Sequence, residues 1–309
     1  MTLLPRPGPL AAWIMAARPR TLPASTAGVI VGSALAYGAG SFELLPALAA
    51  LVVASALQIA SNIANDVFDF ERGSDSIRTL GPTRVTQAGL ISPGAMKAGL
   101  AVAIGVAALA GLSLAWHAAT IAPGSWPWLL GVGFLAILSA VAYTAGPFPL
   151  AYLGLGDLFV LVFFGIASVA GTWFTQAGTL APAPFLLALG PGLIIVNILV
   201  VNNLRDVEED RQVGKRTLVV RFGKGFGKAE YLACMAGAYA VVPLGIGLGL
   251  VPAWTLLAWL SAPLAVMNAS SVLHKEGQAL NATLAGTGQT SFVWAALFAV
   301  GMFIAGGRA

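Results

Sequence analysis

The sequence has few residues of the kinds that form disulfides, thiolate metal sites or charged surfaces. Cys234 is the only cysteine among 309 residues, which excludes an intramolecular disulfide and disfavours thiolate metal chemistry. The two histidines, His117 and His274, are predicted to lie on opposite sides of the protein, which disfavours a shared zinc site. Charged residues make up only 9% of the chain, against about 25% in an average soluble domain. An ordinary soluble protein is therefore excluded.

Apolar residues make up most of the chain. They account for 58% of the sequence, and the mean hydropathy is +0.86. Because about 20 apolar residues cross a bilayer as a helix, the sequence predicts an all-α polytopic membrane protein with nine transmembrane helices and a single domain over residues 1–309. The expected spans are 21–38, 44–65, 95–115, 126–145, 153–176, 184–203, 229–249, 252–271 and 290–306.

Charge is distributed unevenly between the two sides that nine spans create. Every Lys and Arg except Arg308, and every Asp and Glu except Glu43, falls on the side that holds the N-terminus. By the positive-inside rule this side is cytoplasmic, so we expect a multi-pass protein of the cell (inner or plasma) membrane with a cytoplasmic N-terminus. The basic residues are mixed with acids instead of forming a run, which argues against nucleic acid as a partner.

The first unusual motif, "SNIANDVFDFERGSD" (61–75), places acids directly after the second apolar span. If the helix continues for one more turn, Asp66 and Asp69 share a face, with Asn62 one turn behind Asp66. Two carboxylates and an amide are then expected to point the same way.

A second motif, "NNLRDVEEDRQVGKRT" (202–217), repeats this arrangement after the sixth span. Asp206 and Asp210 are four residues apart, with Asn203 one turn before Asp206, so they share a helical face. The likeness predicts a weak internal repeat in which spans 1–4 correspond to spans 5–8, followed by span 9. Equivalent helices would then bring both motifs to one cavity.

Carboxylates that gather in one cavity repel each other unless a cation lies between them. Mg²⁺ suits carboxylate and amide oxygens and is usually shared with phosphate oxygens of a substrate. Basic side chains near both motifs suit the same highly charged anion. The alternative is that both loops are merely solvated and self-neutralising, but two matched motifs favour a Mg²⁺ and phosphate site. The expected phosphate contacts are Arg78, Arg84, Arg205, Lys215 and Arg216.

Five stretches of the sequence resemble the UbiA superfamily of membrane prenyltransferases. They are "RPRTLPA" (18–24), "NIANDVFDFERGSD" (62–75), "LGPTRVTQAGLI" (80–91), "YTAGPFPLAYLGLGD" (143–157) and "VNNLRDVEEDRQVGKRTL" (201–218); "EGQALNATLAGT" (276–287) is similar in character. The resemblance implies nine helices around a central cavity that opens to the cytoplasm, and a polyprenyl diphosphate held through Mg²⁺ with its tail toward the lipid bilayer. Carried over, the motif residues are Asn62, Asn65, Asp66, Asp69, Asn203, Asp206 and Asp210; the family's third acid is replaced by Gly73, leaving Asp75 as its nearest substitute.

Within the superfamily the sequence is most similar to the branch that prenylates 1,4-dihydroxy-2-naphthoate with loss of pyrophosphate and CO₂, giving a quinol that oxidises to demethylmenaquinone. From the residues alone, 4-hydroxybenzoate, homogentisate or haem remains open as the acceptor. Tyr143 and Asp157 are candidates to orient or deprotonate the acceptor hydroxyl, with an interfacial anchor and a helix cap as the alternatives. A transporter is the rival class, but ionisable residues are missing from the predicted span centres, where transporters usually carry them.

Overall fold

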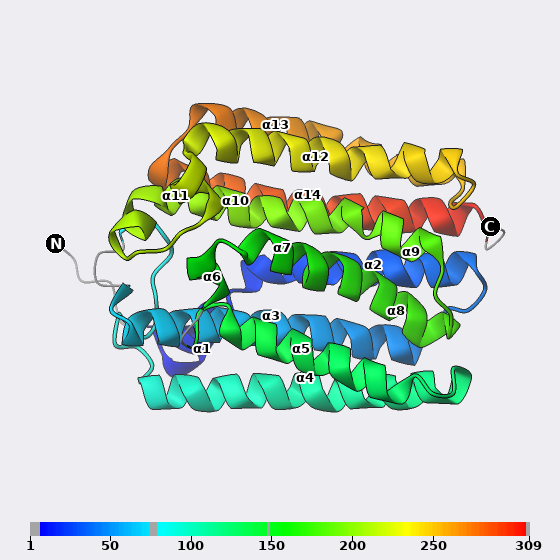
Figure 1. Cartoon of the computed structure of the whole chain (residues 1–309), viewed down its shortest axis with the longest axis horizontal. Coiled ribbons are helices and arrows are strands. Elements are labelled where there is room, and N and C mark those ends of the chain that lie inside the picture. Colours follow the sequence, from blue (N-terminus) through cyan, green and yellow to red (C-terminus); the bar gives the residue numbers. More distant parts are fainter. Residues whose placement is uncertain (1–6, 75–78, 147–148, 307–309) are drawn as a thin grey trace.

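The computed structural model describes residues 7–74, 79–146 and 149–306, and every regular element within these ranges is helical. The long helices run side by side along the longest axis, and the described part of the chain begins near one end of the bundle and finishes at the other, where α14 ends (Figure 1). The elements are α1 (Pro9–Ala17), η1 (Pro19–Thr21), α2 (Leu22–Gly38), α3 (Leu44–Glu71), α4 (Pro93–Ile121), α5 (Trp126–Ala142), α6 (Leu150–Leu153), α7 (Gly156–Val160), η3 (Leu161–Ala167), α8 (Ser168–Ala177), α9 (Pro182–Leu187), α10 (Leu189–Gln212), α11 (Leu218–Phe222), α12 (Lys224–Gly247), η4 (Ala253–Ser261), α13 (Ala262–His274), η5 (Gly277–Ala279) and α14 (Leu280–Ile304).

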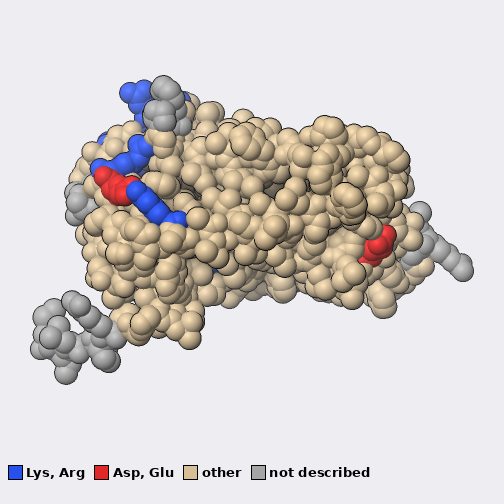
Figure 2. All heavy atoms as spheres, turned by 90° about the horizontal axis from the view of Figure 1, so that it is seen from below, with Lys and Arg blue, Asp and Glu red and all other residues tan. Residues whose placement is uncertain are grey.

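Seven helical segments of the described chain are long and apolar enough to cross a membrane. The helix α5 is apolar but shorter, and α2 has 17 residues. Figure 2 shows charged side chains gathered near one end of the molecule, an acidic patch near the other, and a broad surface of other residues between them. This is a multi-pass helical membrane protein, and the count of nine spans stays a prediction.

The acidic motifs lie on helices because two of the long helices continue beyond their apolar stretch. The helix α3 has 28 residues and at 1.5 Å per residue is roughly 42 Å long, against about 30 Å of hydrocarbon. The helix α10 likewise continues to Gln212. Both helices end at the same end of the bundle as α1, α6 and α11 (Figure 1). Asp66 and Asp69 therefore lie on the final turns of a spanning helix, where water replaces lipid.

The expected fifth span is not one regular helix. A short helix, α6, ends at Gly154 in the left-handed conformation (φ 73°), which glycine adopts without steric cost. The span then runs through α7, the π-helical η3 and α8. Gly165 of η3 lies against Gly192 of α10 so closely that a Cβ on Gly165 would come 2.9 Å from the Gly192 Cα. The irregular turn and the two glycines thus let spans 5 and 6 approach closely.

The expected start of the last span at residue 290 is wrong, since α14 begins at Leu280. Its first turns contain polar residues that lower the hydropathy of that stretch, but the side chains of Thr283, Thr287 and Thr290 are buried in the bundle. The hydroxyls of Thr287 and Thr290 donate to the carbonyls of Thr283 and Gly286, one turn earlier. The polar residues at the start of α14 therefore belong to a helix packed in the protein interior and not to a loop.

Candidate active site at one end of the bundle

A cavity of about 900 Å³ opens among the ends of the helices that carry the two acidic motifs. Residues from α3, the 79–91 segment, α7, α10 and α14 line it. The polar side chains in its wall include Arg18, Arg20, Gln58, Asn62, Asn65, Asp69, Arg84, Tyr143, Thr144, Asp157, Asn202, Asn203, Arg205, Asp206, Asp210, Lys215, Thr217, Gln278 and Asn281.

In the first motif, Asn65 and Asp69 are the pair that lines the cavity one helical turn apart. The Thr144 hydroxyl donates to Asn65 Oδ1 at 2.9 Å, which fixes the amide. Arg84 donates to Asp69 Oδ2 at 3.1 Å, and both side chains are buried. The other oxygen, Asp69 Oδ1, is buried and accepts no hydrogen bond from the described residues. Such an oxygen is costly to bury unless a ligand approaches it.

The structure corrects the expected position of Asp66 and shows which groups Asn62 binds. Asp66 is not part of the cavity wall; its two oxygens accept the backbone N–H groups of Val85 and Thr86, both at 3.0 Å. Asn62 reaches the cavity, but its amide donates to the Ala17 carbonyl and to the Thr21 hydroxyl, both at 3.0 Å. Residues 62 and 66 share one helical face and residues 65 and 69 the next, because positions three apart differ by about 60° around the axis. The first face bonds neighbouring segments and reaches the cavity at Asn62 but not at Asp66, whereas the second face lines the cavity at both residues.

In the second motif a buried arginine holds the first acid. Arg205 Nε lies 2.6 Å from Asp206 Oδ1, and Arg205 Nη2 lies 2.6 Å from Asp206 Oδ2. The same guanidinium donates to the amide oxygens of Asn202 and Asn281, and Asn281 in turn donates to the Leu80 carbonyl at 3.0 Å. The Arg205 guanidinium thereby connects α10, α14 and the 79–91 segment. A buried polar network stabilises a fold when its members are hydrogen-bonded in this way.

Lys215 connects the two motifs directly. Its Nζ lies 3.5 Å from Asp210 Oδ1 and 3.8 Å from Asp69 Oδ2. Glu209 adds a second connection, because it accepts the backbone N–H and the hydroxyl of Thr79, both at 2.8 Å. Charges from α3 and α10, which are far apart in the sequence, therefore meet in a single site.

Other residues expected at the site fall into three groups. Tyr143, Asp157 and Asn203 lie in the cavity wall. Arg216 is exposed and is not among the residues of that wall. Arg78 and Asp75 lie outside the residues that the structure describes.

Sequence reasoning missed several residues of the cavity wall. Arg18 lies at the break between α1 and η1 with a left-handed backbone (φ 51°), which is uncommon for a residue other than glycine and is often found at functional sites. Gln278 and Asn281 come from the start of the last span. The stretches "RPRTLPA" (18–24) and "EGQALNATLAGT" (276–287) contain these residues, so their resemblance to the family was the signal that could have identified them. Glu276, two residues before Gln278, is exposed and accepts a hydrogen bond from Lys224. This hydrogen bond lowers the pKa of the Glu276 carboxyl.

The donor types of the cavity suit a hard divalent cation, although no three Asp, Glu, His or Cys side chains of the described residues already surround one metal position. The carboxylates of Asp69, Asp206 and Asp210 and the amide of Asn65 supply oxygen atoms, which Mg²⁺ prefers. Among the described residues, neither cysteine nor histidine lines the cavity, so the ligand types that zinc favours are not offered there. The buried Asp69 Oδ1, which accepts no hydrogen bond from the described residues, is the atom most suited to bind a metal ion.

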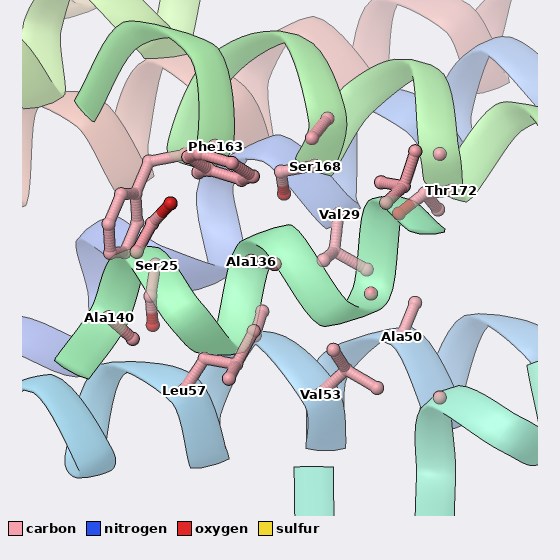
Figure 3. A pocket seen from close by; sticks show the side chains of 18 of the residues that line it. Ser25, Val29, Ala50, Val53, Leu57, Ala136, Ala140, Phe163, Ser168 and Thr172 are labelled. Atoms are coloured by element: carbon pink, nitrogen blue, oxygen red, sulfur yellow. The ribbon is translucent and has the colours of Figure 1, made fainter. Parts of the chain in front are cut away.

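An apolar cavity of about 210 Å³ continues from the polar one into the bundle. Both cavities share Ser61, Tyr143, Val160 and Phe164 in their walls. Figure 3 shows Phe163, Leu57 and other side chains from α2, α3, α5 and η3 around this space. A ligand with a charged head and an apolar tail matches this arrangement, because each part meets surroundings of its own polarity.

The fold and the site define a polytopic helical membrane protein that gathers carboxylates and bases at the end of an apolar groove. Residues 25–294 match the UbiA prenyltransferase family, and the chain belongs to this family. Proteins named 1,4-dihydroxy-2-naphthoate octaprenyltransferase are similar over nearly their whole length. The Escherichia coli (strain K12) protein is 40% identical, covering 95% of both chains, and the Mycobacterium tuberculosis protein is 38% identical, covering 92% of this chain and 94% of the relative.

Solved structures share the fold at lower identity. A UbiA homolog from Aeropyrum pernix K1 has a TM-score of 0.66 and 17% identity, and the match covers 92% of this chain and 97% of that one. A homolog from Archaeoglobus fulgidus bound to DMAPP and Mg²⁺ has a TM-score of 0.64 and 12% identity, covering 94% of this chain and 99% of that one. These likenesses confirm the predicted all-helical fold of the family.

Proposed function

We propose that this prenyltransferase moves a polyprenyl group from its diphosphate to 1,4-dihydroxy-2-naphthoate, with loss of pyrophosphate and CO₂, to give a prenylated quinol whose later oxidation yields demethylmenaquinone for menaquinone synthesis. The names of full-length relatives at 30 to 40% identity support the acceptor. The convergence of Asp69 and Asp210 on Lys215 is the observation that carries the chemistry, because it unites acids and bases at the mouth of an apolar groove.

Charge separation is the barrier to this reaction, since the bond between the allylic carbon and the diphosphate oxygen breaks with both electrons going to oxygen. We assign Asp69, Asp206 and Asp210, with Asn65, to hold Mg²⁺, which when bound supplies positive charge to the departing pyrophosphate. Arg84 and Lys215 lie beside the same carboxylates and stabilise the negative charge that develops in the transition state. Asp66 holds the segment that carries Arg84 in place. Arg205 and the neighbouring Asn203 keep the second motif in position.

The ring carbon that bears the carboxylate then gives an electron pair to the allylic carbon. The bond from that ring carbon to the carboxylate breaks next, its electrons return to the ring, and CO₂ leaves. No proton leaves this carbon, so the step needs no base there. Tyr143 and Asp157, both in the cavity wall, are proposed to orient the ring through its hydroxyls. Phe163 and Phe164 line the adjoining groove, where they exclude water from the cation and present aromatic faces to it.

The acceptor also carries a carboxylate that needs a cation away from the diphosphate. Arg18 is proposed for this task because it lines the cavity from the α1 side and comes from a different segment than the bases of the two acidic motifs. Its left-handed backbone is fixed on both sides: the Thr21 hydroxyl donates to the Arg18 carbonyl at 2.9 Å, and Asn62 donates to Ala17 and Thr21. A cation on a backbone held this firmly is suited to orient an anion.

The membrane setting follows from the charge distribution. We propose that the site faces the cytoplasm of the cell's inner or plasma membrane and that the N-terminus lies on the same side. Lys and Arg concentrate in the segments at the ends of α3, α10 and α13, as the positive-inside rule requires for cytoplasmic segments.

The direct test uses purified protein in detergent with Mg²⁺, an octaprenyl diphosphate and 1,4-dihydroxy-2-naphthoate, with prenylated product and pyrophosphate both quantified. We expect metal-dependent product with the naphthoate and none with 4-hydroxybenzoate or homogentisate. The double variant Asp69→Asn, Asp210→Asn is the matched control and should be inactive. Product from another acceptor alone would change the proposed acceptor, and product from the double variant would contradict the proposed site.

A further inference from the structure

The ring of Tyr152 in α6 lies close to two cations, one beside each acidic motif. The centroid of its ring is 5.5 Å from Lys215 Nζ and 5.4 Å from Arg72 Cζ. Both distances fall within the range of about 6 Å in which a cation is attracted to an aromatic face. Arg72 directly follows the helix of the first motif and Lys215 follows the helix of the second, so a single ring holds a cation from each.

The ring is firmly placed. Its hydroxyl forms a 2.6 Å hydrogen bond with the Ser74 hydroxyl. The backbone of the segment is bonded on two sides: the Ala151 N–H donates to the Tyr143 carbonyl at 3.0 Å, and the Arg216 N–H donates to the Tyr152 carbonyl at 3.2 Å. Tyr152 is half-buried and is not among the residues of the cavity wall.

The ammonium group of Lys215 needs such support. Its two carboxylate distances, 3.5 Å and 3.8 Å, are longer than a good hydrogen bond, and a lysine side chain has a flexible four-carbon stem. Acids on one side and an aromatic face on another restrict where the ammonium can lie. The ring attracts the cation without offering it a competing anion.

We infer that Tyr152 is a positioning residue that aims the Lys215 ammonium at the diphosphate of the donor, so that it controls pyrophosphate affinity through Lys215. The inference rests on the proposed function, because it takes a diphosphate as the ligand. It goes beyond the proposed function because it assigns a role to an aromatic residue outside the cavity wall. Arg72, held by the same ring, donates to the Gly146 carbonyl, so the ring also joins the end of α3 to the segment before α6.

The test compares Tyr152→Phe, which keeps the ring and loses only the hydroxyl, with Tyr152→Leu and Tyr152→Met, which remove the aromatic face. Binding of inorganic pyrophosphate with Mg²⁺ is measured by calorimetry, alongside KM for the prenyl diphosphate and for the naphthoate. We expect Tyr152→Phe to stay within about twofold of the wild type. Tyr152→Leu and Tyr152→Met should weaken pyrophosphate binding and raise the donor KM by about three- to thirtyfold, as expected for a lost cation–π contact, with the acceptor KM unchanged.

A double-variant series separates positioning from a general structural role. In a Lys215→Met background, Tyr152→Leu should have no further effect on pyrophosphate binding, because the cation it acts through is gone. The exposed Phe222→Leu on α11 is the control for loss of an aromatic residue at the same end of the bundle. Equal losses with and without Lys215, or a donor affinity unchanged in both non-aromatic variants, would overturn the inference. A wild type that binds no pyrophosphate would instead contradict the proposed function, and this inference with it.

Discussion

The carboxylates of Asp69 and Asp210 face the same ammonium group. Asp69 Oδ2 and Asp210 Oδ1 lie 3.8 Å and 3.5 Å from Lys215 Nζ, although the two acids come from helices that are far apart in the sequence. A cation between them lowers their mutual repulsion. The cavity thus collects carboxylates with basic side chains beside them, which is the composition that a metal and a diphosphate require together.

Asp69 and Asp66 are expected to respond differently to the same substitution. Asp69→Asn removes a carboxylate that faces the cavity, and its loss should lower kcat/KM by about 10² to 10³, the range for removing one transition-state stabilising group. It should also raise the Mg²⁺ concentration for half-maximal rate. Asp66→Asn should leave the Mg²⁺ requirement unchanged and lower the unfolding temperature instead, because it disturbs two backbone hydrogen bonds of the 79–91 segment.

The measurement for this pair is a Mg²⁺ titration of the rate, with thermal unfolding in the same detergent. Chelation of the metal with EDTA should abolish product formation in the wild type, and added Mg²⁺ should restore it. If Asp66→Asn shifts the Mg²⁺ dependence as far as Asp69→Asn does, the separation of the two helical faces has no functional meaning.

Arg18 is predicted to distinguish acceptors by their carboxylate. Arg18→Gln should weaken binding of 1,4-dihydroxy-2-naphthoate by about tenfold or more, as expected for a charged hydrogen bond of about 1.5 to 3 kcal/mol. Binding of 1,4-dihydroxynaphthalene, which lacks the carboxylate, should change little. Calorimetry with both ligands gives the comparison, and an equal loss for both would assign Arg18 a purely structural role.

The apolar cavity that continues from the polar one is predicted to bind the prenyl tail. Ala136 of α5 lines this space, so Ala136→Phe should obstruct it and raise KM for octaprenyl diphosphate more than for the five-carbon dimethylallyl diphosphate. Val102→Phe is the matched control, because Val102 is 67% exposed on the outer face of α4. Competition between the two donors in one reaction, analysed by mass spectrometry, measures the ratio. An unchanged ratio in Ala136→Phe would place the tail elsewhere.

Gly190 is predicted to be essential for the packing of α10 against α14. A Cβ at this position would collide with the indole ring of Trp294, which is fully buried and stacks on Phe298 with ring centroids 5.6 Å apart. Gly190→Ala should therefore destabilise the protein by about 1 to 3 kcal/mol, as overpacking does. Thermal unfolding in detergent is the measurement. Gly105→Ala on α4 is the control: nothing lies within 4 Å of its added Cβ, so helix propensity alone should make it neutral or stabilising.

The sequence was most informative about features that the surrounding lipid or water determines. Apolar runs predicted most of the long helices, since lipid selects them by composition. The two acidic motifs were expected to meet in one cavity, and the structure places Asp69, Asp206 and Asp210 in the wall of one. Boundaries were less predictable: the polar start of α14 at Leu280 was assigned to a loop, because hydropathy does not distinguish a buried threonine from an exposed one.

Within the site, the sequence by itself determined which residue types were available, namely oxygen ligands and bases in two matched motifs after long apolar spans. Only the tertiary structure decided which of them share a face and a cavity. Asp66 and Asp69 look equivalent in the sequence, yet backbone N–H groups of a distant segment bind the first, while the second keeps a buried oxygen without a hydrogen bond from the described residues. The roles proposed for Tyr152 and Arg18 likewise depend on contacts across the bundle. Such contacts depend on helix rotation and packing, which local composition does not encode.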